Sequence, residues 1–177
     1  MNFKDDEIKV LISRDEIAEK VAEAARELSE IYKGKNVVVV PLLRGAFIFA
    51  SDLVRVMNTD VQVEFIGASS YGDATVTSGE VRLTQDTALP LSGRNVLIVE
   101  DIVDTGLTLA YIQRLILSRK PASRRTIVLL DKKIKRQVDV QLDNILFEIP
   151  DMFVFGYGLD SPGGYNRNLP DIMAVKN

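Results

Sequence analysis

Three carboxylates, two hydroxyls and one glycine fall within nine consecutive residues of the chain. They are Glu100, Asp101, Asp104, Thr105, Gly106 and Thr108. The backbone amides of such a turn can bind an anion, most often a phosphate. Carboxylates beside a bound phosphate would repel it unless they hold sugar hydroxyls, a metal ion or a proton. The combination therefore predicts a site for a sugar phosphate together with Mg²⁺.

The residues on either side of this stretch predict the elements that position it. Four apolar residues at 96–99 precede it and are typical of a strand buried on both faces. After it, apolar residues recur at helical spacing: Leu107, Leu109, Ile112, Leu115 and Ile116. The turn thus joins the carboxyl end of a strand to a helix N-terminus, where open α/β sheets bind ligands and the helix dipole favours an anion. The alternative is an ordinary strand–turn–helix connection in which an acid serves only as the N-cap.

The composition limits the possible chemistry. The 177-residue chain has no cysteine and no histidine, so acid–base catalysis must use Asp, Glu, Lys or Tyr. Any metal must accept oxygen ligands, which suits Mg²⁺. A net charge of −3 argues against a dedicated nucleic-acid binder, and no apolar run approaches the roughly 20 residues of a membrane span. The acidic start of the chain lacks the apolar segment of a signal peptide, so we expect a cytoplasmic protein without membrane contact.

Residues 100–108, Glu-Asp-Ile-Val-Asp-Thr-Gly-Leu-Thr, resemble the phosphoribosyl-pyrophosphate (PRPP) motif of type I phosphoribosyltransferases, in the form typical of the hypoxanthine-guanine branch. The resemblance implies that Glu100 and Asp101 bind the ribose hydroxyls and Mg²⁺. It also implies that Asp104 is the general base that takes a proton from N7 of a purine. The implied binding segment for the 5′-phosphate of PRPP consists of Asp104, Thr105, Gly106, Leu107 and Thr108.

Leu43-Arg44-Gly45 resembles the pyrophosphate loop of the same family, in which lysine is usual at the position of Arg44. The resemblance implies that Arg44 and Gly45 bind pyrophosphate, and that the Leu43–Arg44 peptide bond is cis. A plain helix-start turn with a surface arginine is the alternative. Arg167 resembles a family arginine that reaches pyrophosphate, but residues 161–164 make the chain one residue longer there than the family pattern, so its register is an open question.

The purine site is also implied by resemblance. Residues 150–160 are similar to the family's purine-binding segment, in which Phe153 stacks on the base, Val154 offers backbone groups and Asp160 helps to hold Mg²⁺. Lys132 resembles the family lysine that contacts the exocyclic oxygen of a 6-oxopurine. This role fits the chemistry, because an ammonium group only donates hydrogen bonds and therefore rejects adenine's amino group. Ile102 belongs to the same implied site. Core packing is the alternative for Phe153.

A lid over the site is expected at about 67–80, where small and polar residues predict a mobile loop. Ser70-Tyr71 match the Ser-Tyr pair of the family's lid. A solvated hairpin tip is the alternative interpretation.

Strands and helices alternate without repeats or linkers, which favours a single α/β domain over residues 1–177 with a mainly parallel sheet. A capping box at residues 13–16 begins a helix that ends at Gly34. Apolar runs predict strands at 37–40, 61–66, 81–84 and 126–130. The resemblance refines this to the type I phosphoribosyltransferase fold, with helices flanking the sheet and a small hood from the N-terminal segment and about 150–177. The charged side chains after the central helix are interpreted as solvated surface: Arg119, Lys120, Arg124, Arg125, Lys133, Lys135 and Arg136.

The function implied by the resemblance is purine salvage. PRPP would transfer its phosphoribosyl group to hypoxanthine, and also to guanine, giving IMP or GMP and pyrophosphate. A PRPP-responsive regulator of the same fold that binds nucleic acid is one alternative, and a xanthine- or orotate-type transferase is another. The implied partners are PRPP, a 6-oxopurine base and further copies of the chain in a homodimer or homotetramer, with no nucleic acid.

Overall fold

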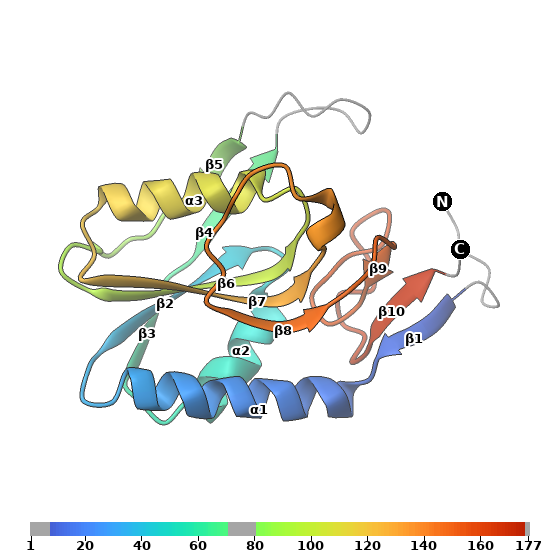
Figure 1. Cartoon of the computed structure of the whole chain (residues 1–177), viewed down its shortest axis with the longest axis horizontal. Helices are drawn as coiled ribbons and strands as arrows, with labels where there is room; N and C mark the ends of the chain where they lie inside the picture. Colours follow the sequence, from blue (N-terminus) through green and yellow to red (C-terminus); the bar gives the residue numbers. More distant parts are fainter. Residues whose placement is uncertain (1–7, 71–80, 176–177) are drawn as a thin grey trace.

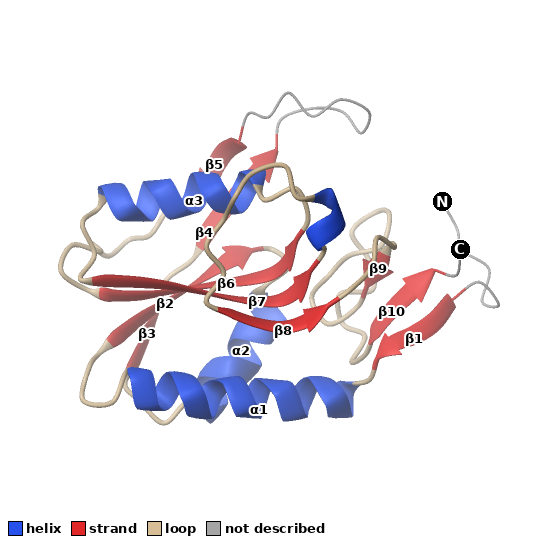
Figure 2. Ribbon diagram, viewed as in Figure 1, coloured by secondary structure: helices blue, strands red, loops and turns tan. Residues whose placement is uncertain are grey.

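A mainly parallel sheet forms the centre of the protein, whose computed structural model describes residues 8–70 and 81–175 (Figures 1 and 2). The strand order is β5-β4-β2-β6-β7-β8. The strand β3 pairs with the first part of β2, and β4 pairs with the end of β2. Its pairings are parallel except between β4 and β5, which are antiparallel. The strands are β2 (Val37–Leu43), β3 (Val61–Val63), β4 (Ile66–Ser70), β5 (Val81–Gln85), β6 (Asn95–Val103), β7 (Ser123–Asp131) and β8 (Asn144–Glu148). The expected α/β class is confirmed.

Helices cover both faces of this sheet. The helices α1 (Arg14–Ile31) and α2 (Phe47–Val56) lie on one face, and α3 (Leu107–Ser118) lies on the other (Figure 1). The expected capping box is present, because Ser13 and Glu16 bond each other's backbone amides at the start of α1. The short 3₁₀ helix η2 (Lys133–Lys135) follows β7.

Two apolar clusters result from this layering. Alternate residues of β2 belong to different clusters: Val37 and Val39 pack toward α1 and α2, whereas Val38 and Val40 pack toward α3. The sheet therefore separates two cores, and the one beside α1 and α2 continues to Val154, Ile172 and Ala174 of a second, smaller sheet.

Strand β2 continues through Pro41 to Leu43, so the prediction of a strand limited to 37–40 was too short. Proline has no N–H for a ladder hydrogen bond and is disfavoured inside a sheet. Here the carbonyl of Val39 accepts from the amide of Glu64, which shows that the backbone of Val39, and of Pro41 two residues later, faces β3 and β4. Pro41 lies at the break between those two strands, since the pairing with β3 ends at Val39 and the pairing with β4 begins at Leu42.

The single strand predicted at 61–66 was wrong. It divides into β3 and β4, and the side chains of Val63 and Phe65 are exposed. Residues up to Ser70 belong to β4, so the loop expected at about 67–80 begins later than predicted. Tyr71 and residues 72–80 lie outside the described residues, and β4 and β5 on either side pair as an antiparallel hairpin.

A small second sheet lies beyond the carboxyl ends of β6, β7 and β8 (Figure 1). Its strand order is β1-β10-β9, and its neighbouring strands are antiparallel: β1 (Ile8–Ile12), β9 (Val154–Phe155) and β10 (Ile172–Val175). The start and the end of the described chain are therefore joined over the edge of the large sheet where ligands are expected.

In the ranges 8–70 and 81–175, every helix is too short or too polar to cross a lipid bilayer.

Candidate active site

The turn between β6 and α3 has the geometry of an anion site. Gly106 precedes the helix with φ +84°, a left-handed conformation that favours glycine. A Cβ at this position would lie 2.9 Å from Cδ of Arg136 and 3.1 Å from the carbonyl oxygen of Val138. Among the described residues, the amides of Thr105, Gly106 and Thr108 have no hydrogen-bond acceptor, so they are available to a ligand at the helix N-terminus.

Arg136 holds this turn through its side chain. The sequence interpretation missed this role, because it assigned Arg136 to the solvated surface. Its Nε–H donates to the carbonyl oxygen of Asp104 over 3.2 Å, and its Nη2 forms an ion pair with Asp131. Asp131 is 2% exposed, so the pair is largely removed from water. The amide of Gln137 adds a 2.9 Å hydrogen bond to the carbonyl oxygen of Thr105. No local pattern signals these contacts, because they join the end of β7 to a neighbouring turn.

Glu100 and Asp101, the two expected ligands of ribose and metal, lie in a poorly solvated place near the end of β6. Burial raises the pKa of Glu100 well above its ordinary range, and the adjacent Asp101 adds to this rise. Burial raises the pKa of Asp101 to about 6, opposed by hydrogen bonds from backbone amides such as that of Ile102 and by the charge of Arg167. In the described part of the chain, Oε2 of Glu100 has no hydrogen-bond partner.

Such carboxylates suit a ligand that brings hydroxyl donors or a hard cation. No group of three or more acidic residues is arranged to hold a metal ion within the ranges that the structure describes. This agrees with the chemistry of Mg²⁺, which commonly takes one or two carboxylates and completes its shell with water and substrate phosphates.

The turn after β2 lies directly against Asp101. A Cβ added to Gly45 would lie 1.5 Å from Oδ2 of Asp101, so only glycine leaves room for the carboxylate. The Leu43–Arg44 peptide bond is cis, as expected. The Arg44 side chain is exposed and forms no ion pair with any described residue, so the structure does not bring it to the acids.

Arg167 lies beside Gly158 and Asp160, and its register against the family pattern stays a prediction. Its Nη1 donates to the carbonyl oxygen of Gly158 over 2.6 Å, and its Nη2 forms a 2.9 Å ion pair with Asp160. The positive charge of Arg167 lowers the pKa of Asp101, and the negative charge of Asp160 raises it. Gly158 in turn packs so closely on the Gly45 carbonyl that a Cβ would lie 2.2 Å from the oxygen. The expected pyrophosphate and metal residues of the C-terminal part therefore converge on Gly45 and Asp101.

Lys132 and Asp104 form the other side of the site. Lys132 is 7% exposed, and burial lowers its pKa while the charge of Asp104 opposes that change. One carboxylate oxygen of Asp104, Oδ1, is buried without a hydrogen-bond partner among the described residues. The Lys132 ammonium, which can only donate, and the unpaired Oδ1 of Asp104, which can accept, thus lie on the same side of the site. Ile102, the other implied purine residue of this strand, is partly buried.

Strand β9 presents an open edge. The amide of Val175 donates to the carbonyl oxygen of Phe153, which turns the backbone of Phe153 toward β10 and that of Val154 away from it. Since β9 is the last strand of the small sheet, the Val154 N–H and C=O point away from β10, although the Val154 residue is buried. Phe153 is 44% exposed, so the alternative of core packing is wrong. Asp151, two residues earlier, forms an ion pair with Lys135 and acts on Lys132, which places this segment beside the lysine.

Ser70 ends β4, and its side chain, like Tyr71, lies outside what the structure describes. Their assignment to a lid stays a prediction.

A parallel α/β sheet with free amides and unpaired carboxylates at the carboxyl end of one strand defines a class of proteins that bind phosphorylated sugars or nucleotides. The chain belongs to the phosphoribosyltransferase family, since the family model described as "Phosphoribosyl transferase domain" matches residues 13–162. Within that family it falls in the hypoxanthine-guanine branch, as the following relatives show.

The hypoxanthine-guanine phosphoribosyltransferase of Aquifex aeolicus (strain VF5) is 44% identical over 171 residues, 96% of this chain and 96% of that protein. A crystal structure of a hypoxanthine-guanine phosphoribosyltransferase from Bacillus anthracis is 42% identical with a TM-score of 0.88, covering 94% of this chain and 98% of the other. The bifunctional protein TilS/HprT of Listeria monocytogenes is 46% identical over 95% of this chain, but the chain spans only 26% of its length.

Proposed function

We propose that this protein transfers the phosphoribosyl group of PRPP to hypoxanthine or guanine and releases pyrophosphate. One observation carries the proposal. The poorly solvated carboxylates of Glu100 and Asp101 lie at the end of β6, next to a turn whose backbone amides have no acceptor among the described residues. Amides hold a phosphate and carboxylates hold ribose hydroxyls, so together they match a ribose 5-phosphate. The names of the relatives that share almost the full length of the chain support the same activity.

The base would lie between Lys132 and the open edge of β9. The Lys132 ammonium donates to the exocyclic oxygen of a 6-oxopurine, and the backbone groups of Val154 bind the edge of the ring. The exposed ring of Phe153 offers a stacking surface. Adenine carries an amino donor where the oxopurines carry an acceptor, so it would leave the ammonium unpaired.

Asp104 is then the group that accepts the N7 proton as the bond from N9 to the ribose forms. Its buried oxygen has no protein donor among the described residues, so it is free to bond the base. The hydrogen bond from Arg136 to its carbonyl oxygen holds the residue at the start of the turn.

Departing pyrophosphate needs stabilisation of negative charge. Arg44, the amide of Gly45 and Arg167 supply donors and positive charge on that side of the ribose. One or two of the carboxylates assigned to the metal, Glu100, Asp101 and Asp160, would hold Mg²⁺ together with water and substrate phosphates, and the bound ion would neutralise part of the charge on the pyrophosphate oxygens. The exposed apolar side chains of α2 and the β3–β4 segment support the expected self-association: Phe47, Val56, Val63 and Phe65.

The deciding experiment measures steady-state turnover of PRPP with hypoxanthine, guanine, xanthine, orotate and adenine. We expect kcat/KM to be at least about 10²-fold higher for hypoxanthine or guanine than for adenine, because a buried unpaired donor is costly. Turnover with orotate or xanthine alone would assign a different transferase. Binding of PRPP without turnover of any base would refute the enzymatic proposal and favour a regulator, which a filter-binding assay with RNA and DNA would then examine.

A further inference from the structure

Residues 156–158 form an unusual turn behind the pyrophosphate loop, which we define as residues 43–46. Gly156, Tyr157 and Gly158 all have positive φ, at +94°, +48° and +101°. The two glycines are required by close packing, since a Cβ would lie 2.2 Å from the Asp171 carbonyl oxygen at Gly156 and 2.2 Å from the Gly45 carbonyl oxygen at Gly158. Tyr157 has a Cβ and adopts the left-handed conformation nevertheless, which is strained for its residue type.

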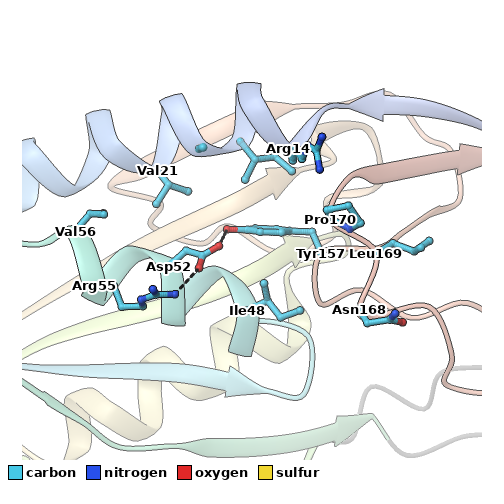
Figure 3. A pocket seen from close by; sticks show the side chains of 12 residues that line it. Arg14, Val21, Ile48, Asp52, Arg55, Val56, Tyr157, Asn168, Leu169 and Pro170 are labelled. Carbon is cyan, nitrogen blue, oxygen red and sulfur yellow. Dashed lines mark hydrogen bonds and ion pairs between the residues drawn. The ribbon is translucent and has the colours of Figure 1, made fainter.

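The Tyr157 side chain connects this turn to helix α2. Its hydroxyl donates to Oδ2 of Asp52 over 2.8 Å, and the ring is 6% exposed (Figure 3). Asp52 lies in α2, whose first turn directly follows the pyrophosphate loop. The turn therefore contacts the loop directly, through Gly158 on Gly45, and it contacts α2, the helix that follows the loop, through the Tyr157 side chain.

The Tyr157 ring packs in the core cluster beside α1 and α2, and it also borders a cavity. A cavity of about 540 Å³ lies beside it between α1, α2 and residues 168–170, and Tyr157 and Asp52 both line it (Figure 3). The cavity leaves the phenol room to move toward α1 if the hydrogen bond is lost. The hydrogen bond to Asp52 is thus the directional contact that fixes the side chain.

We propose that Tyr157 and Asp52 are positioning residues for the pyrophosphate loop. Their hydrogen bond keeps Gly158 against Gly45, and Gly45 against the Asp101 carboxylate, so the loop amides face the leaving group. The inference rests on the proposed function, since it assigns the role to pyrophosphate binding. The base segment has an anchor of its own in the pairing of β9 with β10, so its geometry should depend less on Tyr157 than that of the loop does.

The test compares Tyr157→Phe with Tyr32→Phe in steady-state assays. Tyr32 is 1% exposed, and its hydroxyl has no partner among the described residues, so it controls for loss of a buried hydroxyl. Tyr157→Phe should raise KM for PRPP about fivefold, the factor that one ordinary hydrogen bond represents, with KM for hypoxanthine unchanged. Tyr32→Phe should change neither. Equal changes in both KM values, or none, would overturn the proposal.

Variants of Asp52 separate the hydrogen bond from charge. Asp52→Asn keeps an oxygen acceptor for the Tyr157 hydroxyl and should remain close to wild type, whereas Asp52→Ala should match Tyr157→Phe. The double variant Tyr157→Phe/Asp52→Ala should be no worse than either single one. Arg55→Gln controls for the 4.0 Å ion pair between Arg55 and Asp52. Additive losses in the double variant would contradict the pairing.

Hydrogen exchange distinguishes failure of this inference from failure of the proposed function. The Ala46 amide donates to the Leu42 carbonyl oxygen over 3.2 Å, which gives a protected reporter within the loop. Without any substrate, its exchange should be about fivefold faster in Tyr157→Phe than in Tyr32→Phe. If wild type turns over no purine, the proposed function fails while this comparison still decides the positioning role. Equal exchange rates in the two variants would refute that role.

Discussion

Replacing Asp104 with asparagine should separate catalysis from stability. In wild type, one Asp104 oxygen is buried without a hydrogen-bond partner in the described part of the chain. Keeping a charged acceptor in that condition costs free energy in the unliganded protein. Asparagine has nearly the same shape but no charge, and its backbone carbonyl can still accept the hydrogen bond from Arg136.

The two effects can be given magnitudes. The unfolding free energy should change by less than about 1 kcal/mol, because the substitution removes no protein hydrogen bond among the described residues and the relief of a desolvated charge offsets the lost attraction to Lys132. For a domain of this size that is a shift in Tm of less than about 4 °C. Turnover should fall about 10²-fold or more, the usual contribution of a positioned general base.

The assay is steady-state formation of IMP from PRPP and hypoxanthine, with thermal unfolding of the same preparations. Asp139→Asn serves as the control, since Asp139 is an exposed acid in the segment that follows Arg136. Turnover of Asp104→Asn equal to wild type would remove Asp104 from the mechanism. Lost activity accompanied by lost stability would show that the carboxylate is structural instead.

Three further perturbations follow from the structure. Lys132→Ala should reduce the kcat/KM preference for hypoxanthine over adenine about tenfold or more, and the neighbouring, exposed Lys133→Ala should not; an unaltered preference rejects the role of Lys132. Arg136→Gln leaves Asp131 buried without its cation and should lower the unfolding free energy in urea by about 3 kcal/mol, with recovery on adding Asp131→Asn. Burial raises the pKa of Tyr32 from 10.0 to about 12, so the neutral phenol stabilises the fold fully below pH 10 and this contribution is lost between pH 10 and 12. Stability curves of wild type and Tyr32→Phe should therefore diverge by up to about 3 kcal/mol over that range, and parallel curves would contradict the assignment.

Local pattern was sufficient for much of the fold. The capping box at Ser13, the helix after Gly106 and the buried strand before Glu100 each depend on residues close in sequence. The acids and the turn between β6 and α3 were located for the same reason, because one strand end and one helix start carry them all.

Contacts between distant segments were not predictable in this way. Whether Pro41 interrupts β2 depends on where β3 and β4 happen to break. Arg136 has the composition of a surface residue, and only the folded chain brings it to the Asp104 carbonyl. The hydrogen bond between Tyr157 and Asp52 spans 105 positions and leaves no periodic signal.

The division of the interior by the sheet has a consequence for how substitutions combine. Val38 and Val39 are neighbours in sequence, yet each side chain packs into a different cluster, on opposite sides of a layer of backbone. Energetic coupling between side chains requires shared contacts, so truncations on opposite faces should act almost independently, while distant residues within one cluster interact. Substitutions in the cluster beside α3 can therefore accumulate with little effect on the packing of the cluster beside α1 and α2, which supports the segments proposed to bind the base and pyrophosphate.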